Sequence, residues 1–179
     1  RPKITDGSAL NTDRLYRNNG NNHFTNVSKQ AGITIEGWGH AACITDINRD
    51  GWPDVYVAND FVSNDVCYIN NKDGTFTDKL GEYFKHTGWN AMGTDAVDIN
   101  NDGFTDFISL EMLPETNMRK KRMLSGNEYY NYTNADKYGY VHQYVRNVLQ
   151  LNSGPIPGRH PVFGDIGYMA GVYPTDWSW

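Results

Sequence analysis

The chain has 179 residues and a net charge of −5, with 16 basic and 21 acidic side chains. An acidic chain without a general basic surface is a poor candidate for binding nucleic acid. No stretch is apolar enough over the roughly 20 residues that a membrane-spanning helix needs. We therefore expect neither a nucleic-acid partner nor a membrane span in this part of the protein.

The first predicted element is a β-hairpin with the sequence DRLYRNNGNNHFTN, from Asp13 to Asn26. Asn and Gly at its centre favour a tight turn between two strands. The segment DVCYINNKDGTFTD, residues 65–78, repeats this pattern 52 residues later, so that Tyr16 matches Tyr68 and Phe24 matches Phe76. The sequence therefore predicts the same hairpin twice.

A second repeated pattern follows each of these hairpins. DINRDGWPD, residues 46–54, recurs 52 residues later as DINNDGFTD, residues 98–106, with oxygen-bearing side chains at positions 1, 3, 5 and 9 and glycine at position 6. Alternate side chains of a tight loop can turn toward one centre, and hard oxygen ligands in this number suit Ca²⁺. The predicted Ca²⁺ ligands are Asp46, Asn48, Asp50, Trp52 through its carbonyl group and Asp54, and in the second loop Asp98, Asn100, Asp102, Phe104 through its carbonyl group and Asp106.

The alternative is that Asp, Asn and Gly in these loops merely form turns. A turn needs two or three such residues, whereas both loops share all five, so we interpret both as Ca²⁺ sites. They are not EF-hand loops, because position 12 is Val57 or Ser109 instead of Glu. The segments DVYVAN and DFISL at the ends of the loops are rich in β-formers. Each loop is therefore expected to join two strands.

About forty residues, from Glu111 to Val148, interrupt the repeat. They contain a basic run and then six tyrosines between Tyr129 and Tyr144. One interpretation is a binding surface, since tyrosine is favoured at recognition sites. The other, which we prefer, is a helical excursion packed over the sheets with its charges in solvent. Under the first interpretation the binding residues are Arg119, Lys120, Lys121, Arg122, Tyr129 and Tyr130.

A third copy of the pattern comes near the end of the chain. FGDIGYMAGVYPTDW, residues 163–177, matches FTNVSKQAGITIEGW, residues 24–38, at Phe, Ala-Gly and Trp. Units of 40 to 50 residues with about four strands each are typical of propeller blades. We expect an all-β fold, a fragment of a β-propeller with four-stranded antiparallel blades and a partly helical insertion. The expected divisions are repeats at residues 15–66 and 67–110, an insertion at 111–148 and a partial repeat at 149–179.

The loops and hairpins together resemble the FG-GAP or VCBS repeat, which is the blade unit of integrin α-subunit propellers. A narrower resemblance is carried by SLEMLPE, HQYVRNVLQLN and AGVYPTDWSW. These segments are similar to secreted repeat proteins, abundant in Bacteroidota, that are related to cartilage acidic protein and often carry an ASPIC/UnbV domain. Propellers usually have four to eight blades, so we expect this chain to be part of a longer one.

Two functions remain open from the sequence. The first is a Ca²⁺-binding extracellular propeller that acts as a protein- or glycan-binding or adhesion module, with a structural role for the metal. The second is the scaffold of a secreted carbohydrate-active enzyme whose catalytic residues lie outside this chain. The five histidines are scattered and no hydrolase or protease motif is present, so we expect no enzyme here.

Compartment and redox state follow from the same reasoning. Extracellular Ca²⁺ modules bind the ion at roughly 10⁻⁴ to 10⁻³ M, so we expect a secreted or cell-surface protein. The two cysteines, Cys43 and Cys67, belong to strands that another strand should separate. Two strand spacings are too long for a disulfide, so buried free thiols are expected.

Overall fold

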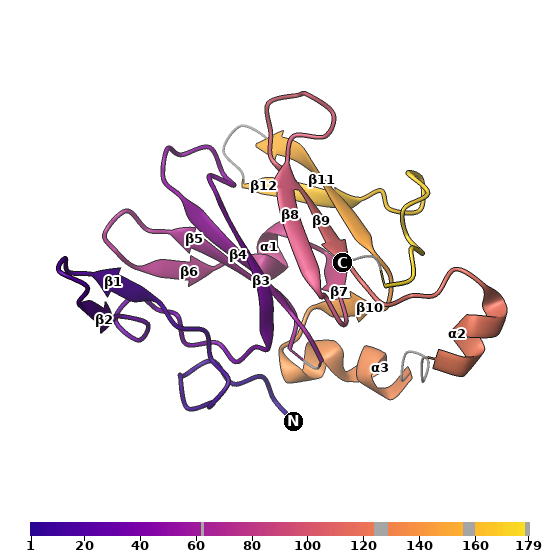
Figure 1. Cartoon of the computed structure of the whole chain (residues 1–179), viewed down its shortest axis with the longest axis horizontal. Coiled ribbons are helices and arrows are strands. Elements are labelled where there is room, and N and C mark those ends of the chain that lie inside the picture. The colour runs from indigo at the N-terminus through magenta and orange to yellow at the C-terminus, as the bar shows by residue number, and fades with distance from the viewer. Residues whose placement is uncertain (62, 124–128, 156–159, 178–179) are drawn as a thin grey trace.

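The computed structural model describes residues 1–61, 63–123, 129–155 and 160–177. Two four-stranded sheets lie side by side in it, with β3 of one beside β8 of the other (Figure 1). The first sheet contains, in spatial order, β3 (Gly39–Thr45), β4 (Asp54–Asn59), β5 (Val66–Asn70) and β6 (Phe76–Asp78). The second contains β8 (Gly93–Val97), β9 (Asp106–Leu110), β11 (Val148–Pro155) and β12 (Pro161–Asp165). All neighbouring strands in both sheets are antiparallel, so the prediction of four-stranded propeller blades is confirmed.

The predicted hairpin is present three times, as the outer strand pair of successive units. It is formed by β1 with β2, by β5 with β6, and by β11 with β12. The first copy comprises β1 (Tyr16–Asn18) and β2 (Phe24–Asn26). Phe163 comes eleven positions after its partner Asn152 in the third copy, whereas the corresponding Phe comes six positions after its Asn in the other two. The third hairpin therefore has the same strand pairing around a longer turn.

The insertion is partly helical, as predicted. It contains α2 (Asn117–Met123), α3 (Tyr129–Tyr138) and the short strand β10 (His142–Tyr144). β10 pairs in parallel with β7 (His86–Gly88), which follows the short helix α1 (Leu80–Tyr83). Figure 1 shows α2 and α3 at the lower edge of the blades, opposite the loops that join β3 to β4 and β8 to β9. None of the helices in the described ranges combines the length and apolarity that a membrane crossing requires.

The main core lies between the two blades and is aromatic. Tyr56 packs on Phe107 with ring centroids 4.8 Å apart, and Phe84 stacks on Phe163 at 4.2 Å. All four side chains are essentially inaccessible to solvent. Val57, on the other face of β4, belongs to a second core that the segment after β2 helps to cover. Both faces of β4 are therefore buried, and the polar residues at its two ends, Asp54 and Asn59, are hydrogen-bonded.

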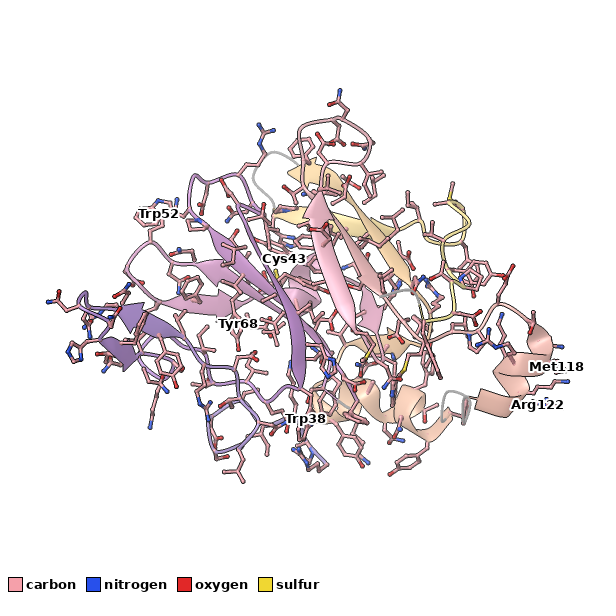
Figure 2. The ribbon with its side chains drawn as sticks, in the orientation of Figure 1. Trp38, Cys43, Trp52, Tyr68, Met118 and Arg122 are labelled. Carbon is pink, nitrogen blue, oxygen red and sulfur yellow. The ribbon has the colours of Figure 1, made fainter. Side chains whose placement is uncertain are left out.

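The two cysteines lie as the sequence predicted. Tyr56 of β4 pairs with Cys43 of β3 on one side and with Cys67 of β5 on the other. The strand β4 therefore separates the two thiols. Both cysteines are free, and burial raises the pKa of each thiol. Figure 2 places Cys43 on the inner strand β3, and its Sγ lies 3.4 Å from the carbonyl oxygen of Thr94. Both cysteines therefore contribute to packing as reduced side chains.

Hydrogen bonds to a buried side chain hold the end of the second strand of each blade, β4 or β9, in place. In the first blade Asp65 accepts from the N–H of Asn59 at 2.9 Å and from the hydroxyl of Tyr56 at 2.5 Å. In the second blade the N–H of Glu111 donates to the side chain of Asn147 at 2.6 Å. Glu111 itself accepts from the N–H of Asn90 at 2.5 Å. Burial raises the pKa of Asp65 to about 7 and that of Glu111 to about 8.

These two carboxyl groups predict that the protein loses stability as the pH rises from 5 to 8. A carboxyl group with a higher pKa in the folded than in the unfolded chain favours the folded state while protonated, and this contribution falls between the two pKa values. Chemical unfolding at fixed Ca²⁺ concentration should show that fall. Asp65→Asn with Glu111→Gln should flatten it, while Glu82→Gln, at an exposed position of α1, should not. A free energy of unfolding that increases steadily from pH 5 to 8 would contradict the assignment.

Candidate functional site

The two predicted metal loops occupy the same place in their blades. Residues 46–53 connect β3 to β4 and residues 98–105 connect β8 to β9, at the upper edge of the sheets in Figure 1. Each loop bends through two left-handed residues, a non-glycine and then Gly51 (φ 87°) or Gly103 (φ 84°). The non-glycines are Arg49 and Asn101, both at φ 59°. Glycine at position 6 of each loop is thus required by the backbone, because other residues rarely adopt this conformation.

The first aspartate of each loop holds the bend together. Asp46 accepts from the N–H groups of Asp50 at 2.9 Å and Gly51 at 2.7 Å. Asp98 accepts from the corresponding N–H groups of Asp102 at 3.1 Å and Gly103 at 2.8 Å. The side chains at positions 3 and 5 also make the same hydrogen bonds in both loops. Asn48 bonds to Asp50 in the first loop, and Asn100 bonds to Asp102 in the second. The two loops therefore have one structure, not merely one sequence pattern.

The aspartate at position 9 is buried in both blades. Asp54 accepts from the N–H of Ile47 at 2.9 Å and from the N–H of Asn70, on the outer hairpin, at 2.8 Å. Asp106 accepts from the N–H groups of Ile99 at 2.9 Å and Asn152 at 2.8 Å. One carboxylate therefore fastens the loop to its own base and to the adjacent hairpin.

The charges of the first loop repel one another. Burial raises the pKa of Asp54, and the neighbouring carboxylates of Asp50 and Asp46 raise it further. Burial also acts to raise the pKa of Asp50, but hydrogen bonds from Asn48 and the Trp52 N–H outweigh it, so the pKa is lowered. The ammonium group of Lys72 lies 3.4 Å from Asp50 and partly balances the loop. A divalent cation would balance it more completely.

The residues of each loop fit Ca²⁺ in their chemistry. Every predicted ligand is oxygen, and three of them are carboxylates, as a hard divalent cation prefers. A carboxylate oxygen that accepts one N–H keeps a second lone pair for a metal. Within the described ranges, however, no three His, Cys, Asp or Glu side chains are already gathered as a metal-binding group. The donor set therefore supports the ion, and a binding measurement is needed to test it.

The predicted binding residues of the insertion fall into two groups. Arg119, Lys120, Lys121 and Arg122 lie on α2, which Figure 2 shows projecting away from the sheets at Met118 and Arg122. Arg119 pairs with Asp176 at 2.5 Å, and the ammonium group of Lys120 lies 5.6 Å from the ring of Tyr173. Tyr129 and Tyr130 begin α3 and are 79% and 62% exposed. Part of the basic run thus attaches α2 to the last segment of the chain, while the two tyrosines face solvent.

Asn70 and Asn152 are site residues that the sequence analysis did not single out. Besides donating to the buried aspartates, their side-chain amides donate to the carbonyl groups of Pro53 at 3.0 Å and Thr105 at 3.2 Å. Each asparagine thus attaches the C-terminal end of its loop to the outer hairpin. Asn70 matches Asn18 in the repeated hairpin, and that match was the available signal.

The blades, the hairpins and the paired loops define a propeller-type repeat protein. A family model described as FG-GAP-like repeat matches residues 4–57 and 46–109, which together span more than half of the chain. The chain therefore belongs to the FG-GAP-like repeat family. A comparison with curated proteins found no match.

The buried aspartates predict a stability effect that does not depend on metal. In EDTA, Asp54→Ala should cost about 2–5 kcal/mol, because it leaves two N–H groups without their acceptor in the interior. Asp50→Ala, which removes a half-buried carboxylate, should cost less than about 1 kcal/mol under the same conditions. Urea unfolding of both variants measures the difference. Equal losses would show that position 9 has no special part in closing the blade.

Proposed function

We propose that this chain is part of a Ca²⁺-stabilised extracellular propeller that binds a protein or glycan. The observation that carries the proposal is the identical loop in two blades, with matching hydrogen bonds at positions 1, 3, 5 and 9. A loop that stabilises the turn between two strands is needed in every blade, whereas a protein needs an active site only once. The repetition supports a structural role for the ion.

Ca²⁺ would supply charge neutralisation and coordination at these loops. The protein's own residues already hold the backbone bend, through Asp46 and Asp98, and connect it to the hairpin, through Asp54 and Asp106. Each loop carries three carboxylates, and their repulsion opposes folding when no cation is present. The metal would remove that repulsion and lock the connection between the inner strands.

The recognition surface of this proposal is the edge opposite the loops. The insertion lies there, and so does Trp38, which Figure 2 shows near the lower end of β3. Trp38 is 54% exposed and contacts the ring of Phe61, itself 56% exposed. Tyr129 and Tyr130 add exposed aromatic rings from α3. Exposed aromatic side chains gathered on one edge are typical of binding surfaces.

The location outside the cell is also part of the proposal. Its support is that the loops lack the bidentate Glu of EF-hands and resemble extracellular Ca²⁺ modules, which bind the ion at roughly 10⁻⁴ to 10⁻³ M. The narrower grouping with secreted relatives of cartilage acidic protein rests on the three resembling segments alone, since the family match extends to the FG-GAP-like repeat and no further.

Calcium should raise the melting temperature of the protein. With a Kd near 10⁻⁴ M, about 1 mM Ca²⁺ adds roughly 1.4 kcal/mol per site, and two sites add close to 3 kcal/mol. For a chain of this size that corresponds to roughly 6–12 °C. Thermal melting with Ca²⁺ and with EDTA measures the shift. Asp50→Ala and Asp102→Ala should each remove about half of it.

The matched control is Asp73→Ala, which removes an exposed turn carboxylate outside both loops. Its melting temperature should respond to Ca²⁺ as the wild type does. A wild-type melting temperature that is the same in Ca²⁺ and EDTA would refute the metal sites, and an equal response to Mg²⁺ would refute their assignment to Ca²⁺.

A further inference from the structure

A small cavity lies where α3 meets β10, the N-terminal segment and the linker before β8. Its volume is about 110 Å³, and five of its nine lining residues are aromatic. These are Trp89, Tyr130, Tyr132, Tyr138 and Tyr140. Only Tyr130 belongs to the candidate binding residues of the insertion. The cavity is therefore built by the insertion together with the N-terminal segment and the linker before β8.

The rings and amides around the cavity are held in place by bonds to other segments. The hydroxyl group of buried Tyr140 donates to Glu36 at 2.7 Å, and the ring of Tyr132 stacks on His142 at 4.6 Å. The carbonyl group of Tyr138 accepts from the N–H of Lys3 at 2.8 Å. Gln143 donates to the carbonyl group of Gly88 at 3.2 Å. Such a lining loses little conformational freedom when a ligand binds.

The charges beside the cavity neutralise each other. The guanidinium group of Arg1 pairs with Glu36 at 2.5 Å, and Glu36 also accepts from the N–H of Ile4 at 3.0 Å. A cationic ligand would find this carboxylate already matched, and an anionic ligand would find the same of Arg1. The cavity thus favours an uncharged ligand with both an apolar face and hydrogen-bonding groups.

We propose that this cavity binds one neutral sugar ring of a glycan. The C–H groups on one face of a pyranose pack against aromatic rings, whose faces carry negative partial charge. Its hydroxyl groups match the side-chain carbonyl group of Gln143, whose N–H groups donate to Ser63 and Gly88, and the polar groups of Asn131 and Tyr130, which also line the cavity. A volume well below the 300 Å³ of ordinary ligand pockets limits the site to part of a single ring. This inference rests on the proposed binding function and names its ligand class.

The preceding repeat offers a natural comparison. Gly37-Trp38 recurs as Gly88-Trp89, but only Trp89 lines the aromatic cavity, whereas Trp38 is open to solvent beside Phe61. The insertion therefore converts one of two repeated tryptophans into the wall of a pocket. Phe24→Ala, which removes an exposed ring on β2 outside the cavity and outside the proposed recognition surface, is the control for Trp89→Ala. Tyr16→Ala, at an exposed tyrosine on β1, is the control for Tyr130→Ala.

Saturation-transfer NMR with methyl α- and β-glycosides of glucose, galactose, mannose and N-acetylglucosamine tests the proposal in the presence of Ca²⁺. At least one glycoside should bind the wild type with a Kd on the order of 1 mM, the affinity expected for a ligand of this size. Trp89→Ala, Tyr132→Ala and Tyr130→Ala should each weaken binding about tenfold or more. Phe24→Ala and Tyr16→Ala should leave the Kd within about twofold. Melting curves of each variant identify any that fails to fold.

Three outcomes would overturn the proposal. They are no binding of any glycoside in the panel, equal losses in the cavity variants and their controls, and tighter binding of tetramethylammonium or inorganic phosphate at the same residues. A fourth outcome would identify the ligand as a protein. In that case this chain would be retained on an immobilised unglycosylated protein, and the glycosides would not displace it. The calcium melt is measured separately, so glycoside binding without calcium stabilisation refutes the metal sites alone. Calcium stabilisation without glycoside binding refutes the sugar site alone.

Discussion

One buried carboxylate in each blade holds three parts of the sheet together. Asp54 and Asp106 accept N–H groups from the start of the loop and from the outer hairpin, so the inner strand pair and the outer strand pair meet at a single side chain. A carboxylate can do this because it offers about four lone-pair positions. Two remain after the backbone bonds are made. The same residue can thus serve the fold and, in the proposed function, the metal.

In the proposed function this constraint separates the metal loops from the recognition surface. The loops, with Asp54 and Asp106, lie at one edge of the sheets, while α2, α3 and Trp38 lie at the opposite edge. The two edges share no side chain among those discussed for either role. Changes to the insertion therefore leave the loops intact, and the blade can carry different binding surfaces on the same frame.

Much of the fold followed from the sequence because the repeat is strict where the backbone needs particular residues. The segments DVYVAN and DFISL coincide with β4 and β9, and the paired Asn and Phe residues locate the hairpins. The first strand of the third hairpin was not recognised, because five extra residues in its turn break the ungapped match. The aromatic cavity could not be predicted either, since Trp89 and Tyr140 come together only through tertiary packing between a linker and an insertion.

The spacing of paired strands also sets an order of assembly. In the first blade β4 and β5 pair residues as near as Val57 and Val66, whereas β9 and β11 pair Ser109 with Val148, across the whole insertion. Closing the longer loop costs about 1.3 kcal/mol more in chain entropy. The first blade can therefore form from local contacts and offer Tyr56 and Phe84 as a surface on which Phe107 and Phe163 assemble. From these pairing distances we expect the first blade to form before the second, in the direction of synthesis.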